Sequence, residues 1–321
     1  MIVRVNTSQM KPSTRSRAAS ENGRELGWEV VETYLTPAKQ VKINGTELTY
    51  VEQGGGPSVI LVHGALGDLR SWSRQLPLLA AKCHVVSYTR RYHGLNSLTD
   101  GAIDYSHRRH VDDLIDLIET LVDGPAHLAG HSYGAAVAAL VAMERPDLVN
   151  TLILGEPTLF SMLSDDVDKV ALRFHAVALN VVRKLSENGE HRLAVREYVN
   201  IVVGRNVFDE LQSHDQFVIN QNAHTLGPML RTYFEATTLD QSSASQITVP
   251  TLLISGGLSP RVYQSIAREL HNCLPRAESF TIPNASHGLP MENEDFGIAV
   301  MEFLSRTESR SKKSTRRTAR K

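Results

Sequence analysis

The segment that most constrains this chain is a serine flanked by glycines, placed between a mostly apolar stretch and an alanine-rich one. Residues 130–134 read G-H-S-Y-G, between the segments 126–129 and 135–140. The pattern G-x-S-x-G in this setting predicts a tight turn from a strand into a helix, with the hydroxyl of Ser132 standing clear of the backbone. The two glycines fit because neighbouring backbone passes too close for a Cβ atom. The helix start behind Ser132 also favours negative charge there.

Two further segments have the pattern of a buried strand that ends in a loop. Ser58–Val62 is apolar and leads into a glycine-bearing loop, where the backbone N–H of Ala65 is the expected donor to an oxyanion. Ser279–Pro283 reads as a late strand, and His287 follows it. Because parallel strands align their C-terminal ends, His287 can serve as general base to a serine far away in sequence.

Together these segments resemble the α/β-hydrolase fold serine hydrolases over about residues 40–305. The likeness rests on His63-Gly64 after its strand, residues 88–94 after the next strand, Ser132 at the turn, residues 250–256 as strand seven, and His287. The order, nucleophile first and histidine last, is the one found in that fold. The resemblance implies a mostly parallel, doubly wound sheet in the α/β class.

The acid that would orient His287 is not at the position most common in this family. After strand seven most relatives have a pattern like G-x-x-D-P, whereas residues 256–260 read G-G-L-S-P and put Ser259 at the aspartate position. A hydroxyl cannot stabilise the imidazolium that forms during catalysis. Strand six ends instead in Glu156, and haloalkane dehalogenases resemble this chain in carrying their acid there. We therefore expect Glu156 to complete the triad.

The pattern of strands and helices divides the chain into five segments. Strands and helices alternate in residues 36–157 and 247–305, which form the predicted hydrolase core. The segment 158–246 has helical periodicity without a convincing strand and is predicted to be a helical cap inserted between strands six and seven. Residues 1–35 are predicted to be a disordered basic arm, and residues 306–321 a disordered basic tail.

Charge is distributed unevenly between the ends and the body of the chain. The net charge of the chain is −1, but five basic residues lie within 1–24 and eight within 306–321. The residues between these two ends are therefore acidic overall. No stacking aromatic residues accompany the basic ones, so we expect no nucleic-acid partner, although basic tails leave that option open. There is no apolar run of membrane-spanning length. Two scattered cysteines indicate reduced thiols and a cytoplasmic protein; the sequence does not predict the oligomeric state.

The nucleophile narrows the predicted chemistry to acyl transfer. With His287 as its base, Ser132 attacks a carbonyl carbon and forms an acyl-enzyme, while the backbone N–H groups of Ala65 and Tyr133 bind the oxyanion. We expect hydrolysis of a carboxylic ester or lactone of a small, largely apolar molecule, with no metal and no organic cofactor. Carbon–carbon bond hydrolysis or cofactor-free haloperoxidase (perhydrolase) chemistry on the same triad stays open. A non-catalytic ligand-binding protein on this scaffold stays open as well.

Overall fold

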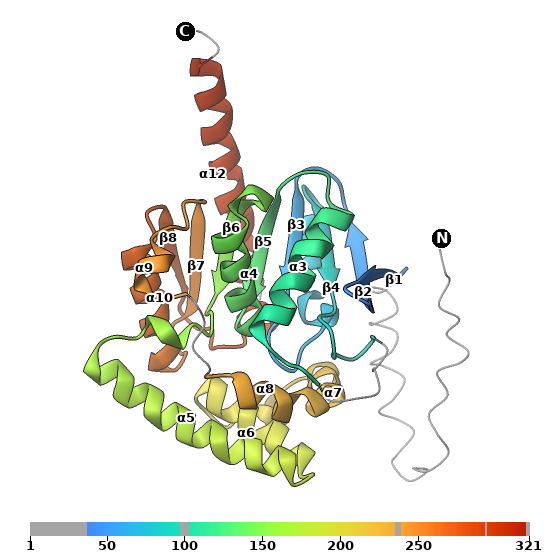
Figure 1. Ribbon diagram of the computed structural model, residues 1–321, viewed down its shortest axis with the longest axis vertical. Coiled ribbons are helices and arrows are strands. Elements are labelled where there is room, and N and C mark those ends of the chain that lie inside the picture. Colours follow the sequence, from blue (N-terminus) through green and yellow to red (C-terminus); the bar gives the residue numbers. More distant parts are fainter. Residues whose placement is uncertain (1–36, 97–102, 235–238, 293, 319–321) are drawn as a thin grey trace.

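A computed structural model describes residues 37–96, 103–234, 239–292 and 294–318, and all structural statements below refer to these residues (Figure 1). Eight strands form one sheet in the order β1-β2-β4-β3-β5-β6-β7-β8. β1 and β2 are antiparallel, β2 is antiparallel to β4, and every other neighbouring pair is parallel. The strands are β1 (Lys39–Ile43), β2 (Thr46–Gln53), β3 (Ser58–Val62), β4 (His84–Tyr88), β5 (Ala126–His131), β6 (Val149–Gly155), β7 (Thr251–Gly256) and β8 (Ala277–Ile282).

Successive side chains of the central strands point to opposite faces of the sheet and fill two separate cores. In β3, Ile60 and Val62 face one core, whereas Val59 and Leu61 face the other. The first core holds α3 (His107–Leu121), α4 (Tyr133–Glu144) and α10 (Arg261–Cys273). The second holds α2 (Leu76–Ala80) and α12 (Asp295–Thr318). These helices on both faces make the doubly wound α/β-hydrolase fold, which confirms the predicted fold class.

The amino-terminal hairpin follows from its turn residues. Asn44 and Gly45 link β1 to β2 with φ of 45° and 78°, the left-handed pair that a two-residue hairpin requires. The segment after β3 forms two short helical pieces, the 3₁₀ turn η3 (Leu69–Trp72) and then α2. Pro77 cannot donate a backbone hydrogen bond and is placed in the first turn of α2.

The described residues between β6 and β7 are helical and form the predicted cap at one end of the sheet (Figure 1). Asn222 ties this insertion to the core. Its side-chain oxygen accepts the Gly94 N–H at 2.6 Å and its amide donates to Asp68 at 3.2 Å. The insertion contains η5 (Phe160–Met162), α5 (Asp166–Glu187), α6 (His191–Val203), η6 (Phe208–Glu210), α7 (Ser213–Gln221), η7 (Ala223–Thr225), α8 (Leu226–Thr232) and α9 (Gln241–Ala244).

Residues 306–318, which belong to the segment predicted to be a disordered tail, are helical in the structure. They continue α12, which extends beyond the body at the end opposite the cap (Figure 1). The helix continues because this stretch has no glycine or proline. Arg306 also pairs with Glu278 at 2.9 Å, and the Thr307 hydroxyl donates to the Phe303 carbonyl at 2.9 Å. The predicted arm at residues 1–35 lies outside the described part of the chain.

Candidate active site

Ser132 lies at the turn between β5 and α4 in a backbone conformation that few residues other than glycine adopt. Its φ is 52° and its ψ is −118°, and its N–H donates to the Gly155 carbonyl at 2.8 Å. The turn is held closed by contact: a Cβ atom on Gly134 would lie 2.3 Å from the Val62 carbonyl oxygen. Such strained turns persist where the surrounding structure fixes them, and they concentrate at functional sites.

His287 connects Ser132 to Glu156 through its two ring nitrogens. Its Nε2 lies 2.9 Å from the Ser132 Oγ, and its Nδ1 lies 2.7 Å from the Glu156 Oε2. All three side chains are buried, with at most 3% of any of the residues exposed. The structure thus brings together three residues separated by up to 155 positions in one hydrogen-bonded chain. This is the geometry in which a carboxylate orients an imidazole toward a nucleophile.

Glu156 leaves the end of β6 and is fixed there by the neighbouring strand. Its φ is 46°, which turns the side chain toward His287, and its Oε1 accepts the backbone N–H of Gly256 at 2.8 Å. Ser259, at the usual position of the acid, is buried, and its Oγ has no hydrogen-bond partner in the described part of the chain. Of the two candidate acids, only Glu156 therefore forms a hydrogen bond with His287.

Two further residues hold His287 in place. His131, which precedes Ser132, lies with its Nε2 2.7 Å from the backbone carbonyl of His287 and donates to it. Tyr263 of α10 stacks on the imidazole, with ring centroids 3.8 Å apart and an interplanar angle of 17°. Burial raises the pKa of Tyr263 well above its usual value, so it remains a neutral phenol. The backbone and the ring face of His287 are thus both fixed from the core.

The loop after β3 passes directly beside Ser132. A Cβ atom added to Gly64 would lie 2.9 Å from the His131 Nδ1 and 3.2 Å from the Ser132 Cβ, so any larger residue here would have to displace these side chains. Ala65 follows in the same loop and Tyr133 begins α4. The two backbone amides predicted to bind an oxyanion therefore belong to segments that border Ser132 on either side.

Arg90 lies behind this loop as a buried cation. It is 1% exposed, and its side-chain contacts in the described regions include no carboxylate. Its Nη2 donates to the Gly64 carbonyl at 3.0 Å and its Nε to the His63 carbonyl at 3.1 Å. Its guanidinium carbon lies 4.8 Å from the centre of the Tyr133 ring, a cation–π distance. Carbonyl oxygens and an aromatic face thus take the place of a counterion.

Aromatic side chains from the cap approach Tyr133, the residue after Ser132. Tyr233 stacks on Tyr133 at a centroid distance of 6.5 Å, and Phe160 lies 5.4 Å from Tyr233. Phe234 lies 5.1 Å from Phe160. A cluster of aromatic rings thus connects the cap to Tyr133.

With this geometry in place, comparison with known proteins is informative. The model of the alpha/beta hydrolase family matches residues 59–299. The chain belongs to the alpha/beta hydrolase family. It is 25% identical over 282 residues to a 2-hydroxy-6-oxo-6-(2'-aminophenyl)hexa-2,4-dienoic acid hydrolase from Metapseudomonas resinovorans, covering 83% of this chain and 90% of the relative.

Another relative and one solved structure show the breadth of the family. The chain is 26% identical over 258 residues to an sn-1-specific diacylglycerol lipase from Mus musculus, covering 77% of this chain and 81% of the lipase. The crystal structure of an alpha/beta hydrolase from Sphaerobacter thermophilus superposes with a TM-score of 0.66 at 25% identity, covering 83% of this chain and 100% of that one. Relatives of this hydrolase thus act on chemically different substrates.

Sequence reasoning missed the roles of Arg90, His131 and Tyr263. Arg90 lies within residues 88–94, which carry part of the family likeness, but its residue type alone indicates no contact with the loop after β3. Tyr263 has no sequence signal, because its stacking depends on how α10 packs against β7. Only His131, adjacent to Ser132, could have been singled out in advance.

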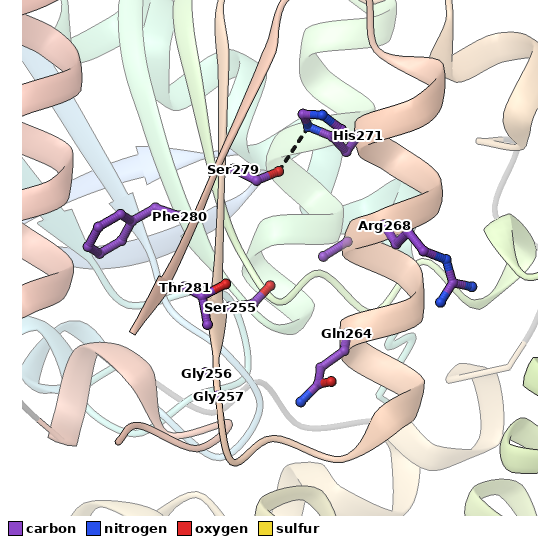
Figure 2. A pocket seen from close by; sticks show the side chains of 10 residues that line it. Ser255, Gly256, Gly257, Gln264, Arg268, His271, Ser279, Phe280 and Thr281 are labelled. Atoms are coloured by element: carbon purple, nitrogen blue, oxygen red, sulfur yellow. Dashed lines mark hydrogen bonds between the residues drawn. The ribbon is translucent and has the colours of Figure 1, made fainter. Parts of the chain in front are cut away.

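The structure also has a surface groove of about 480 Å³ away from these residues (Figure 2). It lies between α10 and β8, where the Ser279 hydroxyl and the His271 ring are hydrogen-bonded at 2.9 Å. Its one cation, Arg268, is paired with Asp168 and Glu269, so the groove offers no free charge. In the described regions no helix is long and apolar enough to cross a membrane, and no cluster of side chains there has the composition of a metal site.

Five histidines near the site are held neutral, of which four are buried and His107 is half-buried. Burial lowers each pKa, and the charge of Arg90 lowers it further for all but His131, where the charge of His287 contributes instead. The pKa of His107 falls to about 4 and that of His131 to about 3. For the other three the pKa lies well below its usual value; these are His63, His93 and His110.

We predict that the free energy of unfolding falls as the pH drops below about 6.5. Below that pH these histidines bind protons in the unfolded chain but stay neutral in the native protein. Each of them therefore lowers the free energy of unfolding by up to about 1.4 kcal/mol per pH unit. Above pH 7 these groups contribute no pH dependence. Urea unfolding between pH 5 and pH 8 measures the slope of the free energy of unfolding against pH. His107→Gln should reduce that slope near pH 5 by the contribution of about one proton. A slope of zero between pH 7 and pH 5 would contradict the prediction.

Proposed function

We propose that this alpha/beta hydrolase is a serine hydrolase that cleaves a carboxylic ester or lactone of a small, largely apolar molecule. The observation that carries the proposal is the hydrogen-bonded chain from Glu156 through His287 to Ser132. The serine hydroxyl is hydrogen-bonded to one nitrogen of the imidazole, and a carboxylate is hydrogen-bonded to the other. This arrangement activates a hydroxyl for attack on a carbonyl carbon. An aspartate at the turn, which would form an alkyl ester, is absent.

The reaction then proceeds in two halves. Ser132 Oγ attacks the carbonyl carbon while His287 Nε2 accepts its proton, and Glu156 offsets the positive charge on the imidazole. Collapse of the tetrahedral intermediate breaks the bond to the leaving oxygen, which takes the proton from His287. Water attacks the acyl-enzyme with His287 again as the base, which releases the carboxylic acid and restores Ser132.

The oxyanion of each tetrahedral intermediate is assigned to the backbone N–H groups of Ala65 and Tyr133. Arg90 supports the first of these from behind. The Gly64 carbonyl and the Ala65 N–H belong to one peptide unit, and this carbonyl accepts hydrogen bonds from Arg90 at 3.0 Å and from His63 Nδ1 at 2.9 Å. A buried cation on the carbonyl polarises that peptide and makes its N–H a stronger donor.

The aromatic groups next to Tyr133 support the proposed substrate class. Tyr233 stacks on Tyr133 and Phe160 lies against Tyr233, and such groups favour an apolar acyl or alcohol group. The likeness to a diacylglycerol lipase supports ester cleavage.

A second candidate is carbon–carbon bond hydrolysis on the same triad. The likeness to the dienoic acid hydrolase over 83% of the chain favours it. A non-catalytic binding role has less support, because its basis was the missing acid after β7, and Glu156 contacts His287 from β6.

The first test of the proposal is removal of the nucleophile. Ser132→Ala should lower the kcat for p-nitrophenyl butyrate by about 10⁴-fold or more, since the acyl-enzyme can no longer form. Labelling by a fluorophosphonate should disappear with it, while the thermal midpoint stays close to that of the parent. Turnover within tenfold of the parent would end the serine-hydrolase assignment, and cleavage of a dienoic acid but of no ester would favour the second candidate.

The second test separates the two candidate acids. Glu156→Gln keeps the shape but loses the charge that stabilises the imidazolium, so kcat should fall by about 10³- to 10⁴-fold. Ser259→Ala is the matched control: its hydroxyl makes no hydrogen bond to any residue that the structure describes, and activity should change by less than about twofold. If the two variants exchanged these effects, Ser259 would be the orienting group.

The third test concerns Arg90. Arg90→Met should lower kcat by about tenfold with little change in KM, because only the intermediate carries the charge that the oxyanion donors bind. Affinity for a phenylboronic acid, which forms a tetrahedral anion on Ser132, should fall in parallel.

Its neighbour Arg91 supplies a matched control. Arg91→Met leaves Asp113 unpaired and should lower the thermal midpoint without lowering kcat. Equal losses of activity in the two arginine variants would show that Arg90 acts only through stability.

A further inference from the structure

Helix α5 of the cap has one face that packs against the rest of the protein and a second, apolar face that stays exposed. One face carries the buried residues Asp168, His175, Leu179, Val182 and Ser186. The other faces solvent. Its large apolar side chains are exposed to unusual extents, namely Val167 57%, Val170 48%, Phe174 74%, Val177 67% and Val181 55%. We call these five residues the α5 stripe.

The spacing of the α5 stripe is that of a helix made to pack against another helix. Successive members are three, four, three and four residues apart, the heptad repeat that keeps one seam facing a partner. Single exposed apolar residues are common, whereas a continuous row of five along one helix marks an interaction surface. Figure 1 shows α5 at the outer edge of the cap, where no other described element lies over the exposed side chains of the α5 stripe.

We propose that the α5 stripe pairs with the α5 stripe of a second copy of this chain, antiparallel, across a two-fold axis. Antiparallel pairing opposes the two helix dipoles. It also sets the acidic start of α5, with Asp165 and Asp166, beside the end of the other helix, where Lys184 lies in the last turn. A two-fold contact is self-complementary, as the most common homodimers are.

Knobs-into-holes packing selects the register. In an antiparallel pair, the two kinds of core position face each other. Phe174 then meets Val177 of the second copy, and Val170 meets Val181. Val167 of one copy meets Lys184 of the other. The ammonium group of that Lys184 then reaches Asp166, which precedes Val167 on the first copy. Arg173 faces Asn180 in this register, so no basic pair forms at the centre.

The size of the contact predicts a dimer of moderate strength. At 22 residues and a rise of about 1.5 Å per residue, α5 is roughly 33 Å long. A contact limited to one such helix pair lies at the lower end of the size range of specific interfaces. We therefore expect dissociation in the micromolar range. The opposite face of α5 meets the body, where His175 contacts Tyr263 at 3.2 Å, so pairing leaves the site near Ser132 unobstructed.

A membrane surface fits the α5 stripe less well than a second copy does. With its N-cap Asp165, α5 carries four acidic and four basic residues. It therefore has no excess of positive charge to attract anionic lipid, whereas opposite charges at its two ends suit an antiparallel second copy.

Sedimentation velocity of the full chain between about 1 and 200 µM tests the proposal. The parent should shift from monomer toward dimer with rising concentration, and Phe174→Asp should weaken the association at least tenfold. Leu258→Asp is the matched control, since Leu258 is 60% exposed but lies off α5, and it should dimerise like the parent. Hydrolysis of p-nitrophenyl butyrate should be equal for all three proteins.

A charge exchange tests the register separately. Lys184→Glu should weaken the dimer, and adding Asp166→Lys should restore it. A parent that stays monomeric throughout, or that dimerises unchanged with Phe174→Asp, would overturn the proposal. Binding of a monomeric parent to phosphatidylglycerol vesicles, lost in Phe174→Asp, would overturn it in favour of a membrane surface.

Discussion

The turn between β5 and α4 is the constraint on which the rest of the site depends. Ser132 occupies a left-handed conformation because β5 must end and α4 must begin within one residue. Gly134 lies against the carbonyl oxygens of Val62 and His63, so the turn, the end of β3 and the loop after it form one rigid unit. A hydroxyl held this firmly needs no reorganisation before attack, which is how preorganised sites lower a barrier.

The buried polar groups behind this turn form the second requirement. Arg90 is a cation without a counterion in the described part of the chain, an expensive group to bury unless every donor is satisfied. The surrounding histidines accept or donate as neutral rings: His63 Nε2 accepts the backbone N–H of Arg90 at 2.9 Å, and His93 is bonded to Tyr105 at 2.8 Å. Burial lowers the pKa values of His63 and His93, and the charge of Arg90 lowers them further. The same charge polarises the Gly64–Ala65 peptide.

The sequence predicted those features that local patterns determine. The strand before Ser132 and the helical insertion after β6 both follow from turn residues and periodicity. Stacking of Tyr263 on His287 and the contact from Arg90 to Gly64 depend on how separate elements pack, which no local pattern encodes. The helical continuation of α12 was missed for a related reason. A basic composition indicates disorder on average, whereas a helix that is already nucleated and packed extends through any residues that tolerate it.

The position of the acid shows why geometry, not order along the chain, defines such a site. β6 and β7 are parallel neighbours, with Gly155 paired to Ile254, so their C-terminal ends lie side by side. A carboxylate leaving either end can reach the same imidazole nitrogen if the backbone turns suitably, and the left-handed φ of Glu156 supplies that turn. The N–H of Gly256, at the end of β7, then binds the Glu156 carboxylate. Strand seven thus still supports the acid, and Ser259 is released from that role.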